Sequence, residues 1–167
     1  PIKFSKSDQV AWKSPLIGIG SSTPIVWGDQ IYLTAGIAED QKAEDEPRHD
    51  AVVAFQMNGK EAWRVLLGPE HPGKHRNGSG SNPSPVTDGK RVFVYYKSGT
   101  VAALDLSGTL LWRANLQELY GKDTLWWDLG SSPALTNEHL IIAVMQAGES
   151  YLVAMDKASG QIAWKTP

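Results

Sequence analysis

The chain has 167 residues, of which 41% are hydrophobic and 20% charged, and its formal net charge is −2. This composition indicates a compact domain, and without a basic patch it argues against nucleic-acid binding. Cysteine is absent, which excludes disulfides and thiolate chemistry, and no apolar run reaches the roughly 18 residues that a membrane span needs.

The first predicted element is a strand over residues 9–14, and it carries a phrase that repeats along the chain. Its Gln-Val-Ala-Trp-Lys-Ser-Pro sequence closely matches Gln-Ile-Ala-Trp-Lys-Thr-Pro at residues 161–167. Related phrases lie between these two, and a tryptophan marks each one about every 50 residues: Trp12, Trp63, Trp112 and Trp164. A spacing this regular predicts an array of repeated structural units.

Each complete unit contains signals for four strands in the same order. An opening phrase rich in Ser, Thr and Pro is followed by a tight polar turn and a run rich in β-branched and aromatic residues. A third run then leads through a glycine turn to the strand that contains the tryptophan. The polar turns are Gly28-Asp29, Asp88-Gly89 and Asn137-Glu138. Such residues suit hairpins, so each unit is predicted to be a four-stranded antiparallel meander.

A period near 50 residues with four strands predicts the blades of an all-β propeller, because such a sheet must stack on its neighbours to bury both faces. A β-sandwich can hold as many strands, but it does not require a repeated Gly-x-x-x-Trp ending. The chain is therefore predicted to be a single propeller segment over residues 1–167, an incomplete ring of about three blades. Its predicted parts are the outer strand of a preceding blade (1–14) and blades at 15–65, 66–114 and 115–167.

The phrase Ala-x-Asp-x-x-Ser-Gly-x-x-x-Trp at residues 154–164 resembles the repeat of PQQ-like β-propellers, also called quinoprotein-type or tryptophan-docking repeats. The Ser-x-Pro openings extend this resemblance over nearly the whole chain. WD40-like and kelch propellers fit less well, since the one Trp-Asp dipeptide, Trp127-Asp128, falls in a connection and no Gly-Gly pair occurs.

The resemblance implies a location and a role for the repeated tryptophans. The family includes alcohol dehydrogenases that use pyrroloquinoline quinone and the propeller lipoprotein of the bacterial outer-membrane assembly machine, so a periplasmic or cell-envelope protein is expected. It also implies that Trp12, Trp63, Trp112 and Trp164 dock between blades as structural residues. Asp105 and Asp156, each before a glycine turn, are expected to accept hydrogen bonds from local N–H groups rather than to act in catalysis.

Three blades do not close a ring, because propellers typically need about four to eight. Each end of the array would then leave an apolar flank exposed, and a large exposed apolar patch marks an interface. We therefore expect the chain either to be part of a larger propeller, in which further blades cover the flanks, or to form a homo-oligomer that completes the ring.

The predicted meander places the long connections on one face of the array, at residues 36–50, 66–82 and 114–130, with a shorter one at 146–150. Binding residues concentrate in long loops on a rigid scaffold, so this face is the candidate site. The connection at 36–50 is acidic but lacks the Asp-x-Asp-x-Asp-Gly spacing of a calcium loop, and it is interpreted as a solvated loop.

Two connections supply candidate partner-binding residues. His71, His75 and Arg76 lie in the second connection; a proline and a glycine between the histidines oppose the helix on which they would bind zinc, so no metal site is expected. Tyr120, Trp126 and Trp127 lie in the third. These aromatic residues either form a stacking platform for a ligand or a partner, or pack over the blades as a plug.

Two classes of function follow from these observations. A noncatalytic scaffold that binds a protein or another ligand through the long-loop face is favoured, with no catalytic residue and no cofactor. The alternative is part of an enzyme that resembles the quinoprotein dehydrogenases and uses pyrroloquinoline quinone with calcium. The resemblance implies a site built from many blades, often with a vicinal cysteine pair, and this chain has no cysteine and no motif that assigns a catalytic Asp or Glu.

Overall fold

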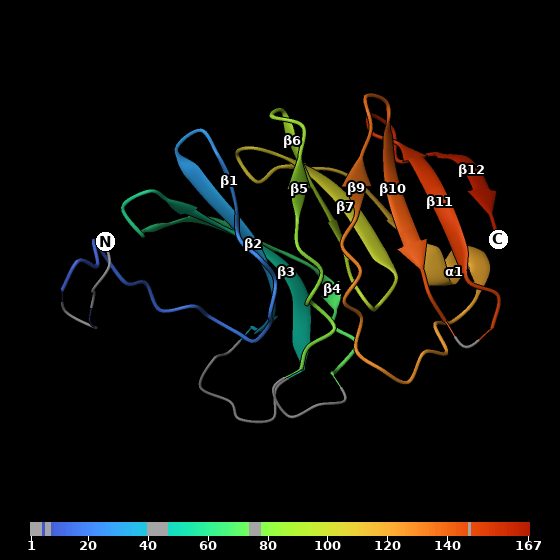
Figure 1. Ribbon diagram of the computed structural model, residues 1–167, viewed down its shortest axis with the longest axis horizontal. Helices are drawn as coiled ribbons and strands as arrows, with labels where there is room; N and C mark the ends of the chain where they lie inside the picture. Colours follow the sequence, from blue (N-terminus) through green and yellow to red (C-terminus); the bar gives the residue numbers. More distant parts are fainter. Residues whose placement is uncertain (1–4, 6–7, 40–46, 74–77, 147) are drawn as a thin grey trace.

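The computed structural model describes residues 5, 8–39, 47–73, 78–146 and 148–167. Their strands form three four-stranded antiparallel sheets, in each of which strands adjacent in sequence are also adjacent in space. The three sheets stand side by side as the blades of an open arc, with the two chain ends at opposite sides (Figure 1). The prediction of an incomplete all-β propeller is therefore confirmed.

The four strands of each blade occur in the order that the sequence repeat predicts. Blade 1 consists of β1 (Ile25–Trp27), β2 (Gln30–Ala38), β3 (Arg48–Gln56) and β4 (Glu61–Pro69). Blade 2 consists of β5 (Val86–Thr87), β6 (Arg91–Tyr95), β7 (Thr100–Asp105) and β8 (Leu110–Asn115). Blade 3 consists of β9 (Ala134–Leu135), β10 (His139–Val144), β11 (Tyr151–Asp156) and β12 (Ile162–Thr166). A helix, α1 (Leu116–Tyr120), follows β8, and no described helix is long and apolar enough to cross a membrane.

The core lies between the blades, as β6 illustrates. Val92 and Val94 belong to a buried cluster shared with blade 1, whereas Phe93 and Tyr95 belong to a second cluster shared with blade 3. Successive side chains of a strand point to opposite faces of its sheet. The central blade is therefore covered on both faces, which explains why its strands read as continuous apolar runs.

Indole rings join each blade to the next. The Trp63 Nε1 atom of blade 1 donates a hydrogen bond to the Leu106 carbonyl of blade 2 (3.1 Å), and Trp112 Nε1 donates to the Lys157 carbonyl of blade 3 (3.0 Å). A Cβ atom on Gly108 would lie 2.7 Å from the Trp63 ring, so the indole lies directly on the glycine turn of the next blade. The geometry explains why a glycine accompanies each tryptophan in the repeat.

The opening phrases also connect the blades. The N–H of Thr23 donates to Ser84 Oγ (2.7 Å), and the N–H of Ser84 donates to Ser132 Oγ (2.9 Å). These three residues occupy the same position, before the proline, in their respective blades. The Ser-x-Pro signature thus supplies a hydrogen bond from each blade to the next.

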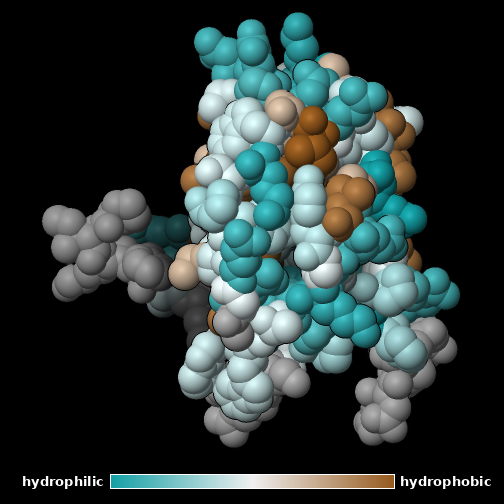
Figure 2. Space-filling view, turned by 90° about the vertical axis from the view of Figure 1, so that its right-hand side faces the viewer, coloured by the Kyte–Doolittle hydropathy of each residue, from teal (hydrophilic) through white to brown (hydrophobic). Residues whose placement is uncertain are grey.

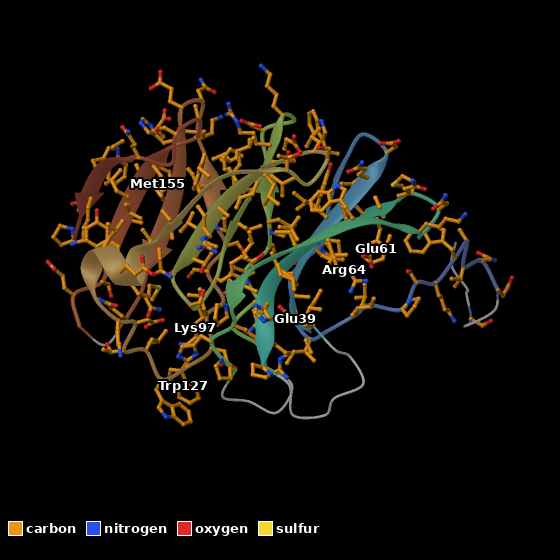
Figure 3. The ribbon with its side chains drawn as sticks, turned by 180° about the vertical axis from the view of Figure 1, so that it is seen from behind. Glu39, Glu61, Arg64, Lys97, Trp127 and Met155 are labelled. Atoms are coloured by element: carbon orange, nitrogen blue, oxygen red, sulfur yellow. The ribbon has the colours of Figure 1, made fainter. Side chains whose placement is uncertain are left out.

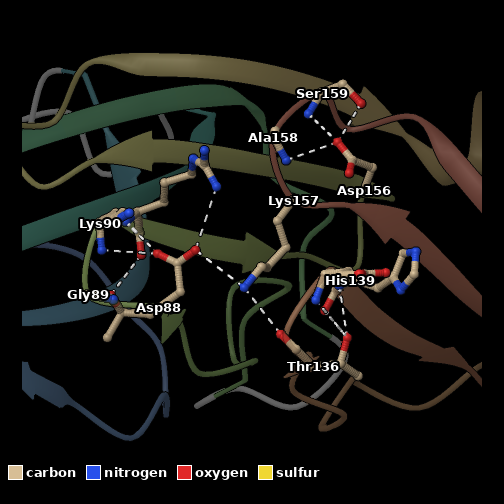
Figure 4. A network of polar contacts seen from close by, with 12 residues as sticks. Asp88, Gly89, Lys90, Thr136, His139, Asp156, Lys157, Ala158 and Ser159 are labelled. Carbon is tan, nitrogen blue, oxygen red and sulfur yellow. Dashed lines mark hydrogen bonds and ion pairs between the residues drawn. The ribbon is translucent and has the colours of Figure 1, made fainter.

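A polar network ties blades 2 and 3 on the side of the tight turns (Figure 4). The Lys157 ammonium lies 3.5 Å from Asp88 Oδ2 and donates a hydrogen bond to the Thr136 carbonyl (3.1 Å). Burial raises the pKa of Asp88, but the N–H groups of Lys90 and Arg91 together with Lys157 hold it below its usual value. The carboxylate of Asp88 is therefore ionised and paired at neutral pH.

Asp105 and Asp156 act as turn residues, as the sequence predicts. Oδ1 of Asp105 accepts hydrogen bonds from the N–H of Ser107 (2.9 Å) and of Thr109 (2.9 Å). Oδ1 of Asp156 accepts from the N–H of Ser159 (2.8 Å) in the corresponding turn of blade 3. These bonds satisfy donors that the turns would otherwise leave unpaired.

Residues 8–14 do not form a strand in this chain. A β-strand needs a hydrogen-bonded neighbour, and the strands of a preceding blade that would supply it are not among the described residues. Trp12 nevertheless lies on the glycine turn of blade 1, since a Cβ atom on Gly59 would be 2.6 Å from its ring. The assignment of 1–14 to a preceding blade stays a prediction.

The two flanks of the arc differ in character. On the side of blade 1, a pocket of about 380 Å³ is lined almost entirely by apolar groups, including Trp12, Val26 and Phe55. On the side of blade 3, Leu152 and Trp164 are exposed, the latter by 43%. Figure 2 shows hydrophobic side chains in the middle of this second face, with hydrophilic ones around them. Both flanks therefore present surfaces against which a further blade can pack.

Candidate functional site

The long-loop face is the end of the arc that carries the connections β2–β3, β4–β5, β6–β7, β8–β9 and β10–β11, at the bottom of Figure 1. The first two of the predicted long connections begin later than the sequence predicts, and the first also ends earlier. β2 extends to Ala38 and β3 begins at Arg48, while β4 extends to Pro69. The long connection predicted at 114–130 contains a short helix, α1, in its first part, which was not predicted from the sequence. Asn115 caps this helix by accepting hydrogen bonds from the N–H groups of Gln117 and Glu118.

Glu70 fixes the connection between blades 1 and 2. Its buried carboxylate accepts hydrogen bonds from Arg48 Nε (2.7 Å), from the N–H of Gly80 (2.9 Å) and from the Ser79 hydroxyl. The side chain also packs on Gly36, where a Cβ atom would lie 2.5 Å from the carboxyl group. The β4–β5 connection is therefore pinned to blade 1 on both sides of its undescribed residues 74–77.

Asp50 forms the second buried carboxyl group of this region. It accepts hydrogen bonds from Ser81 Oγ (2.7 Å) and Ser98 Oγ (2.5 Å), which belong to the connections before and within blade 2. Burial, with a smaller contribution from the nearby Glu70, raises the pKa of Asp50 to about 7, against the lowering effect of the two hydroxyl groups. A titrating carboxyl group of this kind can mark a catalytic base, but Asp50 is fully buried and satisfied by serines. We assign it a structural role between blades 1 and 2.

Lys97, in the β6–β7 turn, holds the loop that follows α1. Its ammonium group is buried, donates hydrogen bonds to the carbonyls of Leu125 (2.9 Å) and Trp127, and lies 3.6 Å from Asp123 Oδ2. The Asp123 carboxylate also accepts a hydrogen bond from the N–H of Leu125 (2.7 Å). A buried charge persists only when it is paired and hydrogen-bonded, so this arrangement fixes the loop backbone on blade 2.

The loop that Lys97 anchors presents two tryptophan side chains to solvent. Trp126 is 63% and Trp127 68% exposed, and their rings meet edge to face with centroids 4.9 Å apart. Figure 3 shows Lys97 close to the blades and Trp127 projecting beyond them at the edge of the long-loop face. Both indole rings are therefore largely exposed in the described arc, and the choice between a stacking platform and a plug over the blades stays a prediction.

Tyr120 is not part of that tryptophan pair. Its ring lies against Tyr151, with centroids 5.4 Å apart, and Lys165 Nζ lies 5.3 Å and 4.7 Å from the centroids of Tyr120 and Tyr151. The C-terminal end of α1 places Tyr120 beside the start of β11, away from the loop tip. Tyr120 therefore packs with Tyr151 and Lys165, and a role of Tyr120, Trp126 and Trp127 in binding stays a prediction.

The histidine-containing connection contributes little that can be described. His71 Nδ1 lies 3.1 Å from the carbonyl of Pro72, while His75 and Arg76 lie outside the described residues, as do residues 40–46 of the acidic connection. Within the described ranges, no three His, Cys, Asp or Glu side chains are grouped to hold a metal ion.

Sequence reasoning missed the buried residues that organise this face. Asp50, Glu70 and Lys97 look like ordinary surface charges in the sequence, and no local pattern predicts that they are buried. The helix had a readable signal, since Asn115 followed three residues later by Glu118 is a typical helix start.

Comparisons with known proteins place this architecture in a family. The family model described as outer membrane protein assembly factor BamB matches residues 48–167. No curated protein matches the chain. Among solved structures, quinohemoprotein alcohol dehydrogenase from Comamonas testosteroni is similar with a TM-score of 0.60 and 18% identity, over 90% of this chain and 21% of that one.

The structure of BamB from Moraxella catarrhalis is similar with a TM-score of 0.51 and 18% identity, over 89% of this chain and 36% of that one. The chain thus spans about a fifth and about a third of these two proteins, and at this identity the likeness concerns the fold alone. The matched residues include all of blades 2 and 3 with their docking tryptophans. The chain therefore belongs to the family of PQQ-like β-propeller repeats that the BamB model describes.

Proposed function

We propose that this chain is part of a noncatalytic propeller scaffold of the bacterial cell envelope, and that it binds a protein partner through its long-loop face. The observation that carries the proposal is the exposed Trp126–Trp127 pair on a loop whose backbone the buried Lys97 holds in place. Aromatic side chains on a fixed backbone lose little conformational freedom on binding and often dominate the energy of protein interfaces.

The proposed location and partner class come from the family to which the chain belongs. Its description names an outer membrane protein assembly factor, which favours the periplasmic side of the envelope and a partner that takes part in outer-membrane protein assembly. The location and the partner class both rest on this family membership.

The quinoprotein alternative needs residues that bind pyrroloquinoline quinone and calcium. In the described segments no acidic group of three or more residues is placed to hold the metal ion, and the one carboxyl with a pKa near neutrality, Asp50, is enclosed by serine hydroxyls. We therefore assign no reaction step to the described residues.

A comparison of two double variants tests the proposed interaction. Trp126→Ala with Trp127→Ala removes the exposed aromatic pair, whereas Leu110→Ala with Leu111→Ala removes apolar side chains of 43% and 46% exposure at the opposite end of blade 2. Affinity-tagged protein purified from envelope extracts, with quantitative mass spectrometry, should lose one specific partner in the tryptophan variant alone. Equal recovery of every protein from both variants would contradict the proposal, as would quinone- and calcium-dependent dehydrogenase activity of the chain.

A further inference from the structure

A small polar pocket opens on the outer rim of the long-loop face, between blades 1 and 2. Its volume is about 240 Å³, and Leu67, Gly68, Thr100, Arg113 and Glu118 are among the residues that line it. Pockets that enclose drug-sized ligands or cofactors usually measure about 300–1,000 Å³. The size therefore suits a single side chain rather than a free organic cofactor.

An irregularity in blade 1 creates this pocket. The pairing of β3 with β4 shifts between Asp50 and Ala51, which leaves Leu67 without a partner in the ladder. Gly68, the next residue, has a φ of 141°, which residues with a side chain rarely adopt. The bulge turns the Leu67 carbonyl toward blade 2, where Arg113 Nη1 donates a hydrogen bond to it (2.6 Å).

Among the described residues, Arg113 donates one side-chain hydrogen bond, and its guanidinium group carries further donors. A guanidinium group has five N–H donors in a planar fork, and it stays charged at any physiological pH. The Leu67 carbonyl accepts one of them, while the side chain as a whole is exposed and lines the pocket. A carboxylate is the group that matches the remaining donors, because two parallel charge-assisted hydrogen bonds can form.

Two other groups define what the pocket accepts. The Thr100 hydroxyl is buried beside it and lies 2.9 Å from Ser98 Oγ. Because the single Ser98 hydroxyl proton is donated to Asp50, Thr100 is the donor in this pair and contributes an acceptor oxygen to the pocket wall. Glu118 is exposed on α1 and also lines the pocket, so its carboxylate repels any further negative charge that a ligand brings into the pocket. The donors that the pocket offers are therefore those of Arg113, with the Glu118 carboxylate beside them.

We propose that this pocket binds the carboxylate of an Asp or Glu side chain of the protein partner, with Arg113 as the residue that recognises it. The inference rests on the proposed function, since it names a second contact on the same face, apart from the tryptophan pair. It makes Arg113 both a tether between blades 1 and 2 and the source of specificity for an acidic partner segment.

The test uses blocked amino acids in place of the partner. N-acetyl-glutamate α-methylamide and the corresponding glutamine compound are titrated into the ¹⁵N-labelled chain, and the arginine Nε–H resonances are followed by NMR. The glutamate compound should shift the Arg113 resonance saturably, and the glutamine compound should bind at least about tenfold more weakly, because it lacks the charge. Equal binding of the two compounds, or no saturable shift, would overturn the inference.

Variants make the assignment specific. Glu118→Gln, which leaves the blade contacts intact, should bind the glutamate compound several-fold more tightly, whereas Arg113→Gln should lose it and Trp127→Ala should retain it. Unchanged affinity in both Glu118→Gln and Arg113→Gln would assign binding elsewhere and refute the proposal. If the glutamate compound binds but the tryptophan variant keeps every envelope partner, the proposed function fails while the pocket stands.

Discussion

Replacing Gly160 by alanine isolates the contact between an indole ring and the glycine turn of the next blade. Gly160 has a φ of +73°, and a Cβ atom there would lie 2.6 Å from Cδ2 and Cε3 of Trp112. Gly28 is a matched control, because its φ is +60° and a Cβ atom there would have no neighbour within 4 Å. Both glycines lie in hairpin turns, and only one of them supports a tryptophan.

The two substitutions share one cost and differ in another. Alanine in the left-handed region costs about 1–2 kcal/mol at either position. At Gly160 the new methyl group must also displace the Trp112 ring, and overpacking of this kind costs about 1–3 kcal/mol more. Gly160→Ala is therefore expected to lower the free energy of unfolding by about 2–5 kcal/mol, and Gly28→Ala by about 1–2 kcal/mol.

Urea unfolding followed by far-ultraviolet circular dichroism measures both effects without relying on tryptophan fluorescence. In a chain that already carries Trp112→Ala, the excess cost of Gly160→Ala should disappear, because no ring remains to be displaced. The reasoning is refuted if Gly160→Ala costs no more than Gly28→Ala, or if its excess cost persists without the indole.

Three further predictions concern single residues. Trp112→Ala removes the hydrogen bond to Lys157 and should cost about 3 kcal/mol in the same urea assay; a cost below about 1 kcal/mol would contradict the docking role. Asp50 keeps its proton up to about pH 7 when folded but ionises near 3.8 when unfolded, so the free energy of unfolding should fall between about pH 4 and 7, by at most about 4 kcal/mol. Asp50→Asn should flatten that profile, and a variant with the parent's slope would refute the assignment. Lys97→Met should increase amide hydrogen exchange in residues 121–130, whereas unchanged protection would show that Lys97 does not hold the loop.

The fold was predictable because its signals repeat. The tryptophans and the glycine turns serve the same contact in successive blades, so each copy in the sequence reinforces the others. The alternation seen at Val92, Phe93 and Val94 likewise follows from a blade that is buried on both faces. At these positions the local preferences of the residues and the packing between blades favour the same structure, so the fold could be predicted from the sequence there.

The long-loop face was only partly predictable, because its organisation depends on contacts between distant residues. Trp126 and Trp127 could be selected as aromatic residues in a loop, but the backbone of that loop is held by Lys97, which lies about 30 residues earlier in the β6–β7 turn. Asp50 and Ser98 are far apart in sequence, and nothing local to either indicates their hydrogen bond. Arg113 reads as an ordinary strand residue, and its pocket exists because of a bulge in a neighbouring blade.

Site-specific photocrosslinking can show whether the long-loop face binds a protein. A photoreactive phenylalanine derivative is placed at Trp127 on that face, and at Lys90 in the β5–β6 turn at the opposite end of blade 2, in the protein expressed in cells. The account predicts one discrete crosslinked partner from position 127 and none from position 90. The same partner from both positions, or discrete crosslinking from position 90 alone, would contradict it.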